Sequence, residues 1–277
     1  MGTQGKVWFV TGSSSGFGRC IVEEVIARGE RVVATARDTR SLEDLVARAP
    51  ERVLAVRLDV TKPEEIRSAV SAAEERFGGI DVVVNNAGYS ILGAVEETSD
   101  EELRAAFEPL FFGAVAVTRA VLPRMRERRS GTIVQLTSLT GLVTFPGTGA
   151  YSAAKHALEA LSESLAKEVE PHGVRVLIVE PGMFRTQLLG PSYRPMPEME
   201  AYAATVGQMR TYVEQSRGQQ PGDPAKAAKA IFDAVASSPS TLRLPLGTDA
   251  PGAIREKLAQ VKAEVDRTEQ LALSMGF

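Results

Sequence analysis

Short runs of β-branched and aliphatic residues recur along the whole chain, and stretches with helical periodicity separate them. Seven of these runs are almost continuously apolar, as expected for strands that are buried on both faces of a parallel sheet. They span residues 6–10, 31–36, 52–58, 81–85, 132–136, 174–179 and 242–246. Strand–helix repetition at this spacing predicts right-handed βαβ units, and therefore an α/β fold with a doubly wound, seven-stranded parallel sheet.

No repeat or low-complexity linker divides the chain, so we expect residues 1–277 to form a single domain. The segment 183–220 differs from the rest, because it is rich in methionine and tyrosine and is too long for a simple connection. Long ordered segments in compact domains are commonly lids or binding loops. We therefore predict a helical insertion that covers a substrate. The alternative is that its apolar residues only pack a surface helix.

Composition restricts the class of protein. Apolar residues make up 44% of the chain and charged residues 24%, and the net charge is −3. This balance is typical of globular proteins and provides no field that would favour nucleic acid or an anionic membrane. No stretch reads as a transmembrane span, and Cys20 as the single cysteine excludes an internal disulfide. With only two histidines and no cysteine or acidic cluster, no metal site is predicted, and we expect a cytoplasmic protein.

The segment Val10–Arg19 reads VTGSSSGFGR and allows two interpretations. The pattern G-x-S-x-G would make Ser14 the nucleophile of a hydrolase. The pattern T-G-x-x-x-G-x-G instead describes a glycine turn that brings a dinucleotide to a helix N-terminus, the Rossmann arrangement. The motif follows the first strand, so no earlier loop could supply oxyanion donors, and the cofactor interpretation is favoured. Gly12 then permits the tight turn, and Gly16 and Gly18 permit close approach of the pyrophosphate.

The end of the second strand predicts which cofactor is bound. An acidic residue there would hold the ribose hydroxyls of NAD, whereas this chain has Ala36 followed by Arg37. A guanidinium can pair with a 2′-phosphate, so we predict NADP(H) rather than NAD(H). The adjacent Asp38 leaves NAD(H) possible, and its alternative role is to cap the following helix.

Three polar residues are candidates for chemistry, and the alternative for the pattern Y-x-x-x-K alone is an ordinary helix surface. Tyr151 and Lys155 are four residues apart in a helical pattern and share one face. Ser138 lies just beyond the C-terminal end of the fifth strand, where open α/β sheets bind their ligands. A nearby ammonium and the positively charged nicotinamide together favour the phenolate and would lower the pKa of the tyrosine toward neutral pH.

The chain resembles the short-chain dehydrogenase/reductase family in segments that occur in the same order over about two-thirds of its length. They are TGSSSGFG (11–18), LDVT (58–61), NNAG (85–88), Ser138, YSAAK (151–155) and PGMFRT (181–186). The resemblance implies hydride transfer between a nicotinamide and a carbonyl or alcohol. It assigns Tyr151 as the acid/base, Ser138 as the hydrogen-bond donor to the substrate oxygen, and Lys155 as the ligand of the nicotinamide ribose. Asp59 would contact the adenine, and Thr186 would hold the carboxamide.

The complete predicted cofactor site is larger than these residues. It consists of Gly12, Ser14, Ser15, Gly16, Phe17, Gly18, Arg37, Asp59, Val60, Asn86, Ala87, Gly88, Tyr151, Lys155, Pro181, Gly182, Phe184 and Thr186. The segments TARD and NNAGYSILG and the long insertion are most similar to the 17β-hydroxysteroid dehydrogenase-like and retinol dehydrogenase-like branch. This implies an apolar carbonyl or alcohol substrate, and a homodimer or homotetramer joined through the long helices that include Tyr151.

One position departs from the family pattern. Where the family has an asparagine that supports a bent helix and a water-mediated proton relay, this chain has Leu110, which has no polar side-chain group. Pro109 precedes it and predicts a bend, so a main-chain carbonyl could still hold the water. The alternative is a cofactor-binding sensor or partner protein with weak or no turnover.

Overall fold

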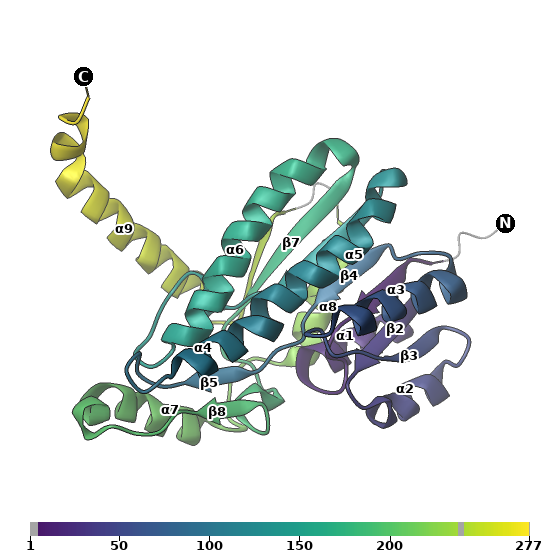
Figure 1. Ribbon diagram of the computed structural model, residues 1–277, viewed down its shortest axis with the longest axis horizontal. Helices are drawn as coiled ribbons and strands as arrows, with labels where there is room; N and C mark the ends of the chain where they lie inside the picture. Colours follow the sequence, from purple (N-terminus) through teal and green to yellow (C-terminus); the bar gives the residue numbers. More distant parts are fainter. Residues whose placement is uncertain (1–4, 238–240, 277) are drawn as a thin grey trace.

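The computed structural model describes residues 5–237 and 241–276. Its main feature is a seven-stranded sheet in which every pairing is parallel and the strand order is β3-β2-β1-β4-β6-β7-β9 (Figure 1). All seven predicted strands are present and the predicted fold class is confirmed. They are β1 (Val7–Val10), β2 (Arg31–Ala36), β3 (Val53–Arg57), β4 (Val82–Asn85), β6 (Gly131–Leu136), β7 (Val174–Pro181) and β9 (Arg243–Leu246).

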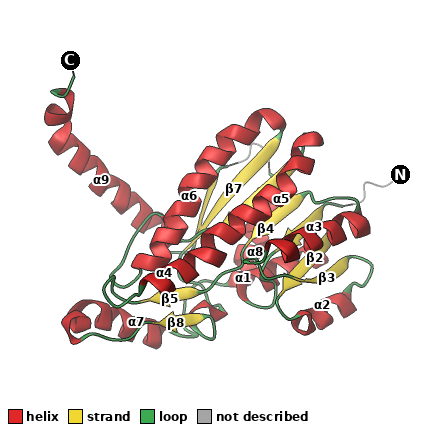
Figure 2. Cartoon of the chain, viewed as in Figure 1, coloured by secondary structure: helices red, strands yellow, loops and turns green. Residues whose placement is uncertain are grey.

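Helices cover both faces of this sheet (Figure 2). Successive side chains of a strand point to opposite faces, so Trp8 packs in one apolar cluster and Phe9 in the other. The first face is covered by α1 (Gly16–Ala27), α2 (Glu43–Arg48) and α8 (Pro224–Ala236). The second face is covered by α3 (Pro63–Phe77), α5 (Ala114–Glu127) and α6 (Gly149–Val169).

The order of the strands fixes where a ligand can bind. The chain moves outward from β1 to β2 and β3, and then returns to the other side of β1 to form β4. At such a reversal the connecting loops diverge and leave a crevice at the carboxyl ends of the strands. The glycine loop, the segment after β4 and Ser138 all follow those ends.

A long helix runs across the second face. It consists of α4 (Asp100–Phe107), a π-helical turn (Glu108–Gly113) and α5, and it spans 28 residues. By length and composition this helix could cross a membrane, so the expectation that no stretch reaches transmembrane length is wrong. The π-helical turn carries the helix through Pro109, the position at which the sequence predicts a bend. Core helices of soluble proteins pass the same test, and Val117, Val121 and Met125 belong to the core.

The segment 183–220 is only partly helical. It contains α7 (Gln208–Ser216) and a short strand, β8 (Tyr193–Pro195), which pairs in parallel with β5 (Ser90–Leu92) in a separate two-stranded sheet. The sequence analysis missed this sheet because neither three-residue strand has a recognisable alternation. The pairing holds the segment 183–220 beside the residues that follow β4. The role of the segment 183–220 as a lid stays a prediction.

Candidate active site

A cavity of about 530 Å³ opens at the carboxyl ends of the central strands. All the residues that the sequence predicted for chemistry or cofactor binding line it, with the exception of Gly18. They are Gly12, Ser14, Ser15, Gly16, Phe17, Arg37, Asp59, Val60, Asn86, Ala87, Gly88, Ser138, Tyr151, Lys155, Pro181, Gly182, Phe184 and Thr186. Seven separate segments of the chain therefore converge on one site.

The glycine loop forms one wall of the cavity. Gly12 and Gly16 have φ values of 68° and 56°, in the left-handed region that favours glycine. The helix α1 starts at Gly16, and the side chain of its N-cap residue Ser15 makes no capping hydrogen bond. The first N–H groups of a helix have no partner within the helix, so this N-terminus can receive a phosphate.

Gly18 has a different role from the one expected. A Cβ atom at this position would lie 2.3 Å from the carbonyl oxygen of Gly12. Glycine is therefore needed for α1 to pack against the loop, and Gly12 and Gly16 line the cavity whereas Gly18 does not.

Hydrogen bonds join the glycine loop to the segment after β4. The Thr11 hydroxyl accepts hydrogen bonds from the N–H groups of Asn86 and Ala87, at 2.9 and 3.0 Å. The Asn86 amide donates in return to the carbonyl oxygens of Thr11 and Gly12, at 2.9 and 3.0 Å. These bonds hold two walls of the cavity in a fixed relation before any ligand binds.

The hydrolase interpretation of Ser14 gains no support. Ser14 is exposed on the loop, and neither His156 nor His172 lines the cavity. His156 Nδ1 lies 2.9 Å from the carbonyl oxygen of Ser152 inside α6. Ser14 has no base beside it.

Ser138, Tyr151 and Lys155 meet at the floor of the cavity. The Ser138 hydroxyl accepts hydrogen bonds from the backbone N–H and the hydroxyl of Thr140, at 3.1 and 3.0 Å. These two bonds occupy its acceptor sites, so the hydroxyl can act only as a donor toward the cavity, where Tyr151 lies. Lys155 Nζ donates to the carbonyl oxygen of Leu136 at 2.7 Å and lies 5.7 Å from the centre of the Tyr151 ring.

Burial controls the protonation of Tyr151 and Lys155. It raises the pKa of Tyr151 to about 12, and the Ser138 hydroxyl opposes this shift. For the protein by itself the pKa of Tyr151 therefore lies above its ordinary value, and the expected fall beside the positively charged nicotinamide stays a prediction. Burial also lowers the pKa of Lys155 to about 8, and the Glu159 carboxylate opposes this shift. The ammonium form that was expected to stabilise the phenolate is therefore itself less favoured than in water.

Comparison with known proteins identifies the family. The family model described as short chain dehydrogenase matches residues 6–197.

The chain belongs to the short-chain dehydrogenase family.

Full-length relatives agree with this assignment. Oxidoreductase BOA17 of Botryotinia fuckeliana is 38% identical over 97% of this chain and 98% of its own. A short-chain dehydrogenase from Streptomyces avermitilis is 48% identical, with a TM-score of 0.92 over 98% of this chain and 100% of its own. One from Burkholderia cenocepacia, solved with NADP, is 27% identical, with a TM-score of 0.75 over 96% and 98% of the two chains. Other solved dehydrogenases hold NAD or NADH, so the family alone does not decide between the nucleotides.

The contacts around Arg37 show what the neighbouring Asp38 does. Arg37 is exposed and lines the cavity, whereas Asp38 does not. Asp38 caps the turn Thr39–Leu42 and forms an ion pair with Arg40 at 2.6 Å. Hydrogen bonds from Arg40 lower the pKa of Asp38 and keep it ionised. Its capping role is confirmed.

Asp59 is held by its own turn. Its carboxylate accepts hydrogen bonds from the Thr61 N–H and hydroxyl, at 3.0 and 2.8 Å. The side chain is therefore fixed at the edge of the cavity on the side where the family resemblance places the adenine.

Leu110, which replaces the asparagine of the family pattern, lies in the π-helical turn and is almost fully buried. It packs in one apolar cluster with Tyr151, Ile91 and Met196. A π-helical turn lies at Pro109, and the bend expected there stays a prediction. Leu110 thus supports Tyr151 by packing, where the family pattern has a polar side chain, and a water held by a nearby carbonyl stays a prediction.

Sequence reasoning missed part of the cavity wall. Tyr89, Glu108 and Arg194 line the cavity as well, and the Arg194 guanidinium lies 4.2 Å from the centre of the Tyr89 ring. The position of Tyr89 directly after the NNAG motif was the one signal available for this group. Arg194 is brought to it by the β5–β8 pairing, which the sequence pattern did not reveal.

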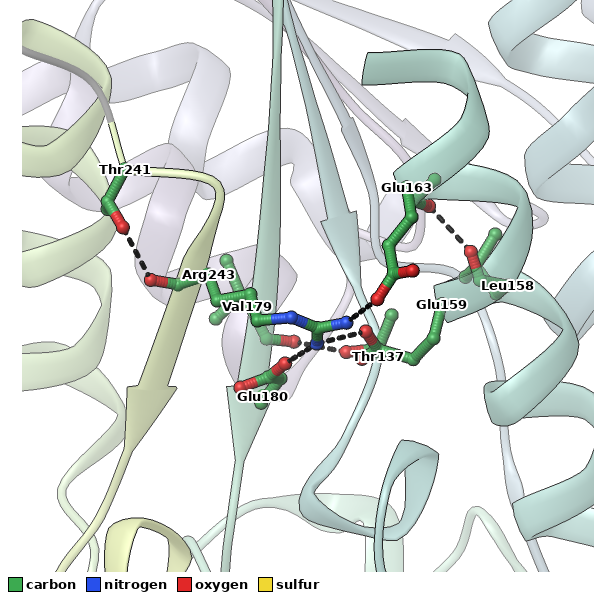
Figure 3. A network of polar contacts seen from close by, with 9 residues as sticks. Thr137, Leu158, Glu159, Glu163, Val179, Glu180, Thr241 and Arg243 are labelled. Carbon is green, nitrogen blue, oxygen red and sulfur yellow. Dashed lines mark hydrogen bonds and ion pairs between the residues drawn. The ribbon is translucent and has the colours of Figure 1, made fainter. Parts of the chain in front are cut away.

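A partly buried charged cluster joins α6, β7 and β9 (Figure 3), and its member Glu159 acts on the pKa of Lys155. The Arg243 guanidinium on β9 forms ion pairs with Glu159 on α6, at 2.7 Å, and with Glu180 on β7. It also pairs with the half-exposed Glu163. Both Glu159 and Glu180 are buried, so the guanidinium offsets a large part of their desolvation cost. The cluster fastens β9 to α6 beside the candidate active site.

We expect this cluster to make stability depend on pH. Burial raises the pKa of Glu159 from 4.5 to about 7. The folded state then binds this proton more tightly than the unfolded state, so the associated stability is present at acidic pH and is lost as pH rises through about 7. Between roughly pH 5 and pH 8, the free energy of unfolding should fall about 2 kcal/mol more in the wild type than in Glu159→Gln.

Urea denaturation at the two pH values measures this difference. Glu163→Gln is the matched control, because it removes a half-exposed partner of the same guanidinium and should keep the wild-type pH dependence. An identical pH dependence in the wild type and in Glu159→Gln would contradict the role of Glu159.

Proposed function

We propose that the protein is an NADP(H)-dependent oxidoreductase that interconverts a ketone or aldehyde and an alcohol on a fairly apolar substrate. The observation that carries the proposal is the meeting of Ser138, Tyr151 and Lys155 at the floor of a cavity whose other wall is a glycine loop at a helix N-terminus. The nicotinamide, when bound, would supply or accept the hydride. The protein would supply binding, orientation and a proton.

The residues of the chain have distinct tasks in this reaction. Ser138 would donate its proton to the substrate oxygen in place of the Tyr151 oxygen, because Thr140 occupies the acceptor sites of the hydroxyl. Tyr151 is protonated at neutral pH, since burial raises its pKa, and so it can give its proton to that oxygen in the direction of reduction. Lys155 keeps donors free besides the one bonded to Leu136, and these can hold the nicotinamide ribose.

The cavity wall supports an apolar substrate. Apolar side chains line part of the cavity, among them Leu110, Leu188 and Pro191. Leu110 packs in one cluster with Tyr151. The test is oxidation of NADPH by the purified protein with a panel of apolar ketones and aldehydes, followed by nicotinamide absorbance. Oxidation that depends on the carbonyl compound supports the proposal, and NADPH binding without turnover would favour a sensor or partner protein.

The proposed preference for NADP(H) rests on Arg37. Its guanidinium lines the cavity at the end of β2, and the nearby carboxylate of Asp38 is engaged with Arg40. We expect Arg37→Ala to lower the ratio of kcat/KM for NADPH to kcat/KM for NADH about 10- to 100-fold, because a charge-assisted pair with the 2′-phosphate is lost.

Steady-state kinetics with both nucleotides measures this ratio. Arg48→Ala is the matched control, since Arg48 is an exposed arginine that pairs with Glu23 and does not line the cavity. A ratio that stays unchanged in Arg37→Ala would contradict the assignment of NADP(H).

A further inference from the structure

The helix α9 (Ala250–Leu273) stands apart from the rest of the protein (Figure 1). Its first residue, Ala250, is buried, and the start of the helix contacts β9 and the turn Leu139–Gly141. From Leu258 to Gly276 every residue is exposed. A helix of 24 residues extends about 36 Å. Packing of an apolar face normally supplies most of the stability of a helix, and in this chain that face has no cover.

The exposed helix carries a regular apolar seam. Its members are separated alternately by four and three residues, the spacing of a coiled coil. They are Ile254, Leu258, Val261, Val265, Thr268 and Ala272. Leu258 is 61% exposed and Val265 is 59% exposed. The Thr268 hydroxyl donates to the carbonyl oxygen of Glu264, so the seam presents its methyl group.

The charges beside the seam are divided between the two halves of the helix. Residues 250–262 carry three cations and one anion, whereas residues 263–273 carry one cation and three anions. Two copies of this helix in antiparallel orientation would place each basic half against the acidic half of the other. In parallel orientation, halves of like charge would face each other.

We propose that α9 pairs in antiparallel orientation with α9 of a second copy of this chain, along the seam from Ile254 to Ala272. A membrane surface fits the helix less well, because its charges sum to zero and it contains no aromatic residue. The pairing is independent of the proposed reductase activity and is separate from an interface through α5 and α6.

The mass of the assembly tests the pairing. We expect light scattering and sedimentation to show that Val261→Asp with Val265→Asp halves the mass of the wild-type assembly. The matched control is Ala259→Asp with Ala263→Asp, which adds the same charges on the other side of the same helix and should leave the mass unchanged. All four sites are exposed, so both variants should keep the wild-type melting temperature.

The orientation is measured separately by pulsed electron resonance. A nitroxide on Ser274→Cys, in a Cys20→Ser background, should give a distance of roughly 30 Å between the two labels in an antiparallel pair. A parallel pair would bring the labels together and would overturn the proposal. It would also be overturned by a monomeric wild type, by an assembly whose mass survives Val261→Asp with Val265→Asp, or by a wild type that binds phosphatidylserine vesicles through α9 as a monomer.

Discussion

Replacing Tyr151 with phenylalanine is expected to lower kcat/KM for carbonyl reduction about 10²- to 10⁴-fold, the usual contribution of a positioned acid or base. Tyr151 is buried at the floor of the cavity, and its raised pKa keeps the proton on the phenol until a substrate oxygen receives it. Phenylalanine keeps the ring that packs against Leu110 but removes that proton. The loss should therefore fall on turnover, while the affinity for NADPH stays close to that of the wild type.

Two measurements separate chemistry from binding. Steady-state kinetics gives the loss in kcat/KM, and fluorescence titration with NADPH gives the affinity. Tyr212→Phe is the matched control, because this exposed tyrosine on α7 loses the same hydroxyl away from the cavity. If Tyr151→Phe kept wild-type turnover, the assignment of the acid would be wrong. A loss of NADPH binding equal to the loss of turnover would make the tyrosine a binding residue.

Replacing Arg210 with methionine is expected to release the segment 183–220 from the body of the protein. Arg210 on α7 forms an ion pair of 2.8 Å with Glu97, and both side chains are buried. The Glu97 carboxylate also accepts hydrogen bonds from the N–H groups of Ala94 and Met199, at 2.7 and 2.8 Å. Removing one partner of a buried pair leaves the other charge uncompensated, at a cost of about 3–5 kcal/mol.

Hydrogen exchange shows which part of the protein loses stability in Arg210→Met. Amide exchange in α7 should become roughly 10²- to 10³-fold faster in Arg210→Met, while the central strands keep slower exchange than α7. Arg217→Met is the matched control, since it removes an exposed arginine from the same segment. Unchanged exchange in α7 would show that the ion pair does not hold the segment in place.

The sequence predicted much of the candidate site because its signals are local. The glycine loop, the serine after β6 and the tyrosine and lysine of α6 each occupy a fixed place relative to a strand or helix that periodicity reveals. Parallel strands bring their carboxyl ends to one edge, so residues that follow different strands must meet there. Leu110 was recognised for the same reason, since its place in the helix is set by nearby residues.

Tertiary structure alone decided the contacts that cross long stretches of chain. The β5–β8 sheet, the contact of Arg194 with Tyr89 and the pairing of Arg243 with Glu159 join segments whose own patterns carry no sign of a partner. The role of Gly18 and the direction of the Tyr151 pKa also required the fold. Steric clearance and desolvation depend on every atom that surrounds a group, and those atoms come from residues far away in the sequence.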